Sequence, residues 1–199
     1  THCISSAASD VYKRQAETLS NIYANYYIGR KLTSMERIRL LSALGKTKYN
    51  LKMFTLNKDV SLPGVTNMGV ADYYSEMPLI FHNSKINLNI TLRSIKSGIP
   101  LRCMDIMGAG GFLLTNFQAD LLDYFIPDED FVYYEDESDM IKKVDYYLEH
   151  DEKRRQIAEN GHRKAAENHS YEKCLTDIFS VVFNSVSYTH LRAHETRHD

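Results

Sequence analysis

Residues that could bind a phosphate group gather where a predicted strand turns into a predicted helix. The turn Arg93–Ile99 follows the apolar, β-branched segment Ile86–Leu92, and Pro100 favours a helix start because its missing N–H needs no partner there. The free N–H groups and dipole of a first helical turn attract phosphate, and Gly98 lets a ligand approach the backbone closely. Arg93, Lys96 and Arg102 surround this turn with positive charge. The sequence therefore predicts an anion site between residues 93 and 102.

Arg102 and Asp105 stand three residues apart near the start of this helix. The helix dipole disfavours a cation there, so Arg102 is easier to explain if an anion binds at the same place. A carboxylate one turn beyond a phosphate site, such as that of Asp105, commonly accepts hydrogen bonds from ribose hydroxyls. The same spacing also suits a surface ion pair worth about 0.2–0.5 kcal/mol. Spacing alone leaves both interpretations open.

Strands alternate with helices along the rest of the chain, which is typical of a parallel sheet covered by helices. The predicted fold class is therefore α/β, with a Rossmann-like parallel sheet and flanking helices. Ligands bind beyond the carboxyl ends of such strands, which adds Thr115 and Asn116 as candidates to line the site. Besides Ile86–Leu92, we expect strands at Leu51–Leu56, Phe112–Thr115 and Phe131–Tyr134, and helices at Tyr73–Ser84, Pro100–Ala109, Asp120–Tyr124, Ser138–Glu149, Asp151–Asn168 and Tyr171–Phe183.

Several local motifs have a structural interpretation. Thr33–Glu36 fits a capping box that would begin a helix, and Lys58–Met68 contains turn-forming residues and predicts a loop. Gly108–Gly111 looks like a dinucleotide fingerprint, but it follows a helix and precedes a strand, so a helix C-cap is the better interpretation. Tyrosine pairs such as Tyr73–Tyr74 favour half-buried packing over a stacking surface.

Composition excludes several function classes. The chain has 24 Lys and Arg against 26 Asp and Glu, a formal net charge of −2, which is no electrostatic footprint for nucleic acid. No apolar run approaches the roughly 20 residues that span a bilayer. Cys103 and Cys174 lie far apart, so they indicate neither a disulfide framework nor a zinc site, and a cytoplasmic location fits best.

Both ends of the chain carry segments unlike natural protein. Ser5–Gln15 resembles one reading frame of a transposon-based sequencing adapter, and Val186–Thr196 resembles a frame of the partner adapter. Such additions carry no fold information. We expect a non-native leader at 1–15, a natural domain at 16–184 and a non-native tail at 185–199, and we do not interpret the histidines of the tail as metal ligands.

A longer stretch connects the predicted anion site to a known family. Gly98–Phe112, with the sequence GIPLRCMDIMGAGGF, resembles the donor-site stretch of GT-B glycosyltransferases, and more closely the CgeB-like, spore-maturation branch of the group 1 glycosyltransferases. The resemblance continues through Asp72–Pro78, Lys85–Thr91, Leu113–Asn116 and Asn160–Tyr171. It covers most of residues 26–180.

The resemblance implies the C-terminal half of a GT-B fold, in which residues 16–184 bind a nucleoside diphosphate sugar. The implied reaction is hexosyl transfer, usually with retention of configuration, to an acceptor that the sequence does not name. It requires no cofactor or bound metal, and the acceptor domain would lie upstream in the same chain. We therefore expect this chain alone to bind nucleotide weakly and to turn over no substrate.

The implied site residues follow the family pattern Glu-x7-Glu. Asp105 stands at the second position, one methylene shorter, and is expected on the donor ribose, whereas Ser97 stands at the first position, so that carboxylate is absent. Because of Ser97, a non-catalytic nucleotide-binding α/β module remains the alternative. The other implied donor contacts are Arg102 on the diphosphate, the backbone of Ser97, Gly98 and Ile99, and Arg93, Thr115 and Asn116.

Overall fold

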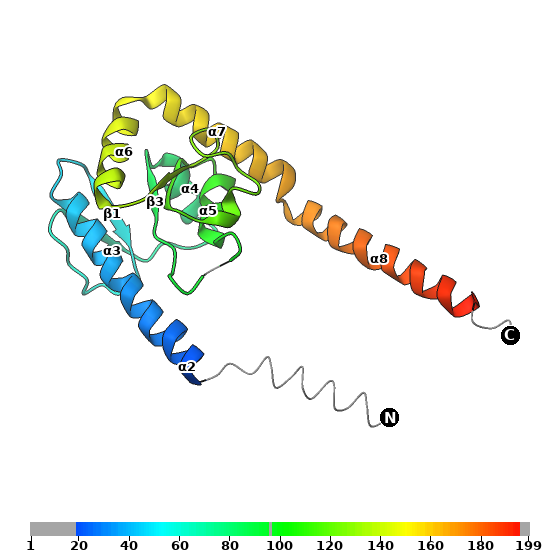
Figure 1. Cartoon of the computed structure of the whole chain (residues 1–199). Helices are drawn as coiled ribbons and strands as arrows, with labels where there is room; N and C mark the ends of the chain where they lie inside the picture. The colour runs from blue at the N-terminus through cyan, green and yellow to red at the C-terminus, as the bar shows by residue number, and fades with distance from the viewer. Residues whose placement is uncertain (1–18, 96, 196–199) are drawn as a thin grey trace.

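The computed structural model describes residues 19–95 and 97–195 and has two parallel sheets flanked by helices (Figure 1). β1 (Leu51–Phe54) pairs with β2 (Val65–Gly69), and β3 (Asn87–Asn89), β4 (Leu113–Asn116) and β5 (Val132–Tyr134) form the second sheet in that order. This arrangement confirms the predicted α/β, Rossmann-like fold class. The helical segments are α2 (Leu19–Ile22), η1 (Tyr23–Ile28), α3 (Gly29–Gly45), α4 (Met77–Asn83), α5 (Leu101–Gly108), η2 (Ala119–Leu121), α6 (Glu137–Glu149), α7 (Asp151–Asn168) and α8 (Tyr171–Glu195).

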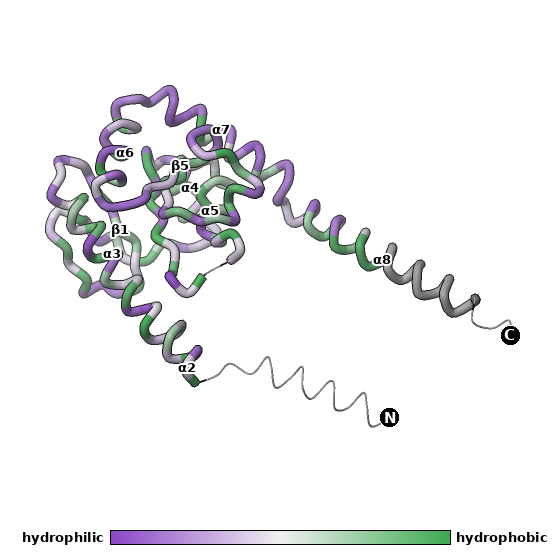
Figure 2. Tube along the Cα trace, in the orientation of Figure 1, coloured by the Kyte–Doolittle hydropathy of each residue, from purple (hydrophilic) through white to green (hydrophobic). Residues whose placement is uncertain are grey.

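The central strand β4 is buried on both faces because its side chains alternate between two cores. Leu114 packs with residues of α3 and α6, including Leu40 and Met140, whereas Leu113 packs on the other side with residues of α4 and α5, including Phe81. Both leucines are at most 1% exposed. A short, fully apolar strand is what a parallel sheet covered on both faces requires. Figure 2 shows apolar residues among the central strands and also along α8, whereas α7 is largely hydrophilic.

The end of α5 confirms the predicted helix C-cap. The Gly110 N–H donates to the Met107 carbonyl and the Gly111 N–H donates to the Ile106 carbonyl, both at 2.9 Å. This is the hydrogen-bond pattern of a Schellman motif, which needs a left-handed residue, and Gly110 has a φ of 75°. Helix α5 therefore ends sharply, and the chain continues into the start of β4. The first turn of α5 thus lies toward the edge of the sheet where the strands end.

The predicted capping box at Thr33 is wrong. Thr33 lies inside α3, which begins at Gly29, and the buried Thr33 hydroxyl donates to the Gly29 carbonyl at 2.8 Å. Its oxygen also accepts from the Arg93 N–H at 3.0 Å, which connects α3 to the turn after β3. Glu36 does not reach back to a helix start but pairs with Arg93. The motif thus serves a tertiary contact instead of a helix cap.

Other differences concern short elements. The segment predicted as a loop at Lys58–Met68 contains most of β2, which forms because Val65–Gly69 pairs in parallel with β1. The helix expected near Asp120 is a single 3-10 turn, η2, and the helix expected at Tyr73–Ser84 begins only at Met77.

The structure describes only part of the two predicted terminal segments. The expected leader, residues 1–15, lies outside the described residues, while residues 185–195 of the expected tail form the end of α8. In Figure 1, α8 extends away from the sheets. Within the described ranges, no helix has the length and apolarity needed to cross a membrane.

Candidate functional site

A hollow of about 240 Å³ lies at the carboxyl ends of β3, β4 and β5. Thr91, Asn116 and Tyr134 line it from or just beyond these strands, and Glu36 lines it from α3. Parallel strands bring their carboxyl ends to one edge, which is where ligands bind in open α/β sheets. We call this region the strand-end hollow. Its polar lining lies at the edge of the sheet where the sequence predicted binding.

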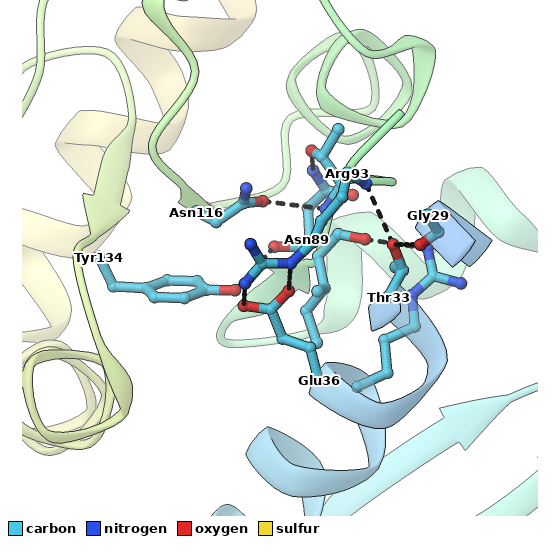
Figure 3. A network of polar contacts seen from close by, with 10 residues as sticks. Gly29, Thr33, Glu36, Asn89, Arg93, Asn116 and Tyr134 are labelled. Carbon is cyan, nitrogen blue, oxygen red and sulfur yellow. Dashed lines mark hydrogen bonds and ion pairs between the residues drawn. The ribbon is translucent and has the colours of Figure 1, made fainter. Parts of the chain in front are cut away.

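A buried hydrogen-bond network holds the floor of the strand-end hollow (Figure 3). The Asn89 side-chain amide donates to the Thr91 hydroxyl at 2.9 Å and to the Thr115 hydroxyl at 3.0 Å. The Asn116 side-chain oxygen Oδ1 accepts from the Thr91 N–H at 2.9 Å. Thr115, predicted to line the site, is 0% exposed and acts within this network instead. Buried polar groups that are fully hydrogen-bonded specify one geometry, so this network fixes the strand ends.

Cys103 of α5 belongs to the same network and is expected to be chemically inert. Burial raises the pKa of its thiol to about 12, against smaller opposing effects of hydrogen bonds with Thr115 and Asn89. At pH 8 only about one thiol in ten thousand would be ionised, and the thiolate is the reactive form.

We therefore expect iodoacetamide to label the exposed Cys174 while Cys103 stays unmodified, as measured by peptide mass spectrometry. Both should react in 6 M guanidinium; equal labelling rates in the native protein would contradict this account.

Arg93 lines the strand-end hollow but is already paired. Its Nε and Nη2 atoms donate to the two carboxylate oxygens of Glu36 at 2.9 and 3.1 Å. This bidentate geometry is the strong form of an arginine–carboxylate contact, although the Arg93 side chain is 57% exposed and solvent weakens the pair. Arg93 and Glu36 of α3 thus form one side of the hollow together, and the Glu36 carboxylate partly neutralises the positive charge of Arg93.

The described residues of the hollow carry more acid than base. Glu36, Glu135, Asp136 and Glu137 stand against Arg39 and Arg93. Carboxylates accept hydrogen bonds from hydroxyl groups, and side-chain amides both accept and donate them, whereas excess negative charge repels phosphate. The hollow therefore suits a neutral, hydroxyl-rich group better than a diphosphate.

The turn that leads into α5 lies beside the hollow and is open to solvent. Ser97 and Gly98 are exposed, Ile99 is partly buried, and Gly98 has a φ of 87°, a conformation that favours glycine. The Gly98 N–H donates to a carboxylate oxygen of Asp120, and the neighbouring Gln118 lines the hollow. An anionic oxygen thus already occupies one amide of the predicted phosphate turn.

Helix α5 begins at this turn without a capping side chain from the described part of the protein. Pro100 precedes the first helical residue and the Cys103 N–H donates to its carbonyl, which leaves the amides of Leu101 and Arg102 without an intrahelical acceptor. Uncapped amides at a helix start form an anion-binding position. The structure therefore keeps the feature from which the anion site was predicted.

Arg102 and Asp105 face a second group of residues away from the hollow. The Arg102 Nη1 atom is 3.8 Å from the Asp105 carboxylate, and its guanidinium lies 5.3 Å from the centre of the Phe81 ring. This Nη1 atom is enclosed and lacks a hydrogen-bond partner among the residues described, while the side chain as a whole is 40% exposed. The Tyr73 hydroxyl donates to Asp105 at 2.8 Å. The pair is thus more than the isolated surface ion pair that spacing alone allowed.

The structure divides the predicted site residues between these places. Arg93 and Asn116 line the hollow and Thr115 lies beneath it, whereas the described residues from Ser97 to Asp105 lie outside its lining. The sequence interpretation missed Tyr73, which it assigned to packing; Tyr73 is 48% and Tyr74 is 86% exposed. The sequence signal that could have indicated an exposed loop here is that both tyrosines follow soon after Gly69, which ends β2.

Among the described residues, no three His, Cys, Asp or Glu side chains come together in a way that could hold a metal ion.

Comparison with known proteins identifies the family. The profile of a family described as glycosyl transferase-like matches residues 34–180, which include both sheets, the strand-end hollow and α5. No curated protein matches the sequence significantly. Because the family profile spans well over half of the chain, this protein belongs to the glycosyl transferase-like family.

Proposed function

We propose that this chain is the donor-binding domain of a glycosyltransferase that transfers a sugar from a nucleoside diphosphate sugar. The observation that carries the proposal is the uncapped start of α5, which lies at the carboxyl ends of parallel strands beside Arg102 and Asp105. The family match supports sugar transfer in general. The donor class follows from the chemistry of these groups, and the acceptor domain is expected in another part of the parent protein.

The donor diphosphate would lie against the first turn of α5. The amides of Leu101 and Arg102 point toward the helix start, and the Arg102 guanidinium adds a cation at the same turn. As the sugar leaves, negative charge grows on the terminal phosphate, and fixed amide dipoles and a guanidinium stabilise that charge without rearranging. No resident metal or other cofactor is part of this proposal.

The ribose would bind to Asp105. One carboxylate oxygen accepts from Tyr73, which fixes the orientation of the group, and the other lies near Arg102. Each ionised carboxylate oxygen can accept more than one hydrogen bond, so Asp105 retains capacity for ribose hydroxyls. Its side chain is 23% exposed, enough to be reached from solvent.

The transferred sugar would extend from the diphosphate into the strand-end hollow. Its lining of carboxylates and the Asn116 amide is suited to hydroxyl groups, as argued above, and Gln118 adjoins the α5 turn. Ser97 has no carboxylate to offer the sugar, so in this proposal Glu36 and Asn116 would provide polar contacts from the opposite wall.

Binding of nucleoside diphosphates tests the proposal. Calorimetric titration with UDP, GDP, ADP, CDP and dTDP should give a measurable Kd for at least one, and Arg102→Ala should weaken that binding about tenfold, because a charge-assisted hydrogen bond contributes roughly 1.5 kcal/mol or more. Arg155→Ala, which removes an exposed guanidinium from α7, is the matched control and should leave the Kd unchanged. Failure of all five nucleotides to bind would contradict the proposal.

A non-catalytic nucleotide-binding module is the second candidate. Ser97 in place of the family carboxylate, and the Asp120 carboxylate on the Gly98 amide, both favour a site that binds without transferring sugar. Incubating the full-length parent protein with nucleotide sugars separates the two candidates. Hydrolysis or transfer supports the enzyme, whereas nucleotide binding without product formation supports the module.

A further inference from the structure

A loop presents two neighbouring tyrosines, and the first of them contacts Asp105. The loop follows β2, and its Tyr73 and Tyr74 rings lie 5.1 Å apart between centroids with an interplanar angle of 87°. Tyr74 is 86% exposed, which leaves a large aromatic face in contact with water. Aromatic rings displayed in this way on an ordered loop are typical of recognition surfaces.

The hydrogen bonds of Asp72 hold this loop in place. Its carboxylate accepts from the Tyr74 N–H at 3.1 Å, from the Ser75 N–H at 2.8 Å and from the Ser75 hydroxyl at 2.6 Å. The Asp72 N–H in turn donates to Glu76 at 2.7 Å. These bonds, first among them the one from the Ser75 hydroxyl, lower the pKa of Asp72, so the carboxylate stays ionised at neutral pH. The backbone that carries Tyr74 is therefore ordered before any ligand arrives.

Tyr73 connects this loop directly to the proposed ribose site. Its hydroxyl donates to the Asp105 carboxylate at 2.8 Å, and this bond is the main reason that the pKa of Tyr73 is raised. In a nucleotide, the base is attached to the ribose by a single bond. A ribose held by Asp105 therefore places its base within reach of the residues that surround this carboxylate, and Tyr74 is the next residue along the loop.

We infer that Tyr74 is the stacking surface for the base of the nucleotide donor. This inference rests on the proposed function. Stacking on an aromatic ring accepts every base because each has a π-face. Tyr74 therefore contributes affinity for the nucleoside part of the donor and little discrimination between bases.

Paired titrations with nucleoside diphosphates and with inorganic pyrophosphate test the inference. Tyr74→Ala should weaken binding of the tightest-binding nucleoside diphosphate by roughly 5- to 150-fold, the range that base–aromatic stacking corresponds to, and leave pyrophosphate affinity unchanged. Tyr74→Phe keeps the ring and should bind like the parent. In proton NMR spectra, the base protons should shift upfield on binding the parent and Tyr74→Phe proteins and not on binding Tyr74→Ala.

The outcomes separate this inference from the proposed function. If the parent protein binds nucleoside diphosphates and Tyr74→Ala binds them equally well, the inference is overturned while the donor site stands. If Tyr74→Phe loses affinity as fully as Tyr74→Ala, stacking is likewise excluded. If no nucleoside diphosphate binds the parent protein, the proposed function fails and the inference fails with it.

Discussion

Replacing Asp105 with alanine will weaken the affinity for nucleoside diphosphates by roughly 10- to 150-fold, because hydrogen bonds to a charged group contribute about 1.5–3 kcal/mol. The change removes the ribose acceptor and leaves the Tyr73 hydroxyl without its partner. It also removes the only carboxylate within 4 Å of the Arg102 guanidinium in the described part of the chain. A thermal-shift titration measures this effect, since a ligand at 100 times its Kd stabilises the fold by about 2.7 kcal/mol.

Two variants separate ribose binding from general charge. Asp105→Glu introduces the glutamate of the Glu-x7-Glu pattern at this position. This variant should bind nucleoside diphosphates as tightly as the parent protein or more tightly. Asp123→Ala removes an exposed carboxylate after η2 and should have no effect. If Asp105→Ala shows the same nucleotide-induced stabilisation as the parent protein, Asp105 is not part of the site.

A large loss of stability is expected for Gly161→Ala in α7. A Cβ atom at this position would lie 2.3 Å from the Asp130 carbonyl oxygen, far inside van der Waals contact. The obstacle cannot move easily, because the Asp130 carboxylate accepts from the Ile126 N–H at 2.7 Å and pairs with Lys164. We expect a loss of about 1–3 kcal/mol and a fall in Tm of roughly 2–12 °C, measured by calorimetry.

Gly108→Ala is the matched control for Gly161→Ala. Gly108 ends α5, and a Cβ atom there would meet nothing within 4 Å. Because alanine restricts the unfolded chain more than glycine, this variant should be about 0.5–1 kcal/mol more stable than the parent. Equal stability of the two variants would show that α7 does not pack closely against the segment that contains Asp130.

The long elements of the fold could be predicted from the sequence because local signals determine them. Helix α7 spans Asp151–Asn168 as predicted, and α6 begins one residue earlier than predicted, with Asp136 accepting from the Asp139 N–H at its start. The buried β4 follows from its apolar run, and the end of α5 follows from its glycines. Hydrophobic periodicity, helix-capping residues and turn-forming residues are all local signals, because each involves residues only a few positions apart in the sequence.

The remaining elements depend on contacts between distant residues. β2 exists because it pairs with β1, and the turn-forming residues before it concealed the strand. Thr33 has a capping sequence, but its hydroxyl meets Arg93, 60 residues away. For the site, the sequence could place Arg102, Asp105 and the turn before them, but the contact between Tyr73 and Asp105 spans 32 residues. Such contacts leave no local pattern, so the sequence could not separate the hollow from the start of α5.

The most direct test of the central proposal is an NMR titration of ¹⁵N-labelled protein with the nucleoside diphosphate that binds most tightly. The largest amide shifts are expected at Leu101, Arg102 and Asp105, with smaller ones at Asn116. Amides at the opposite edge of the sheet, such as those of Lys85 and Arg155, should stay unchanged. Largest shifts at that opposite edge, with Leu101 to Asp105 unaffected, would contradict the placement of the donor diphosphate at the start of α5.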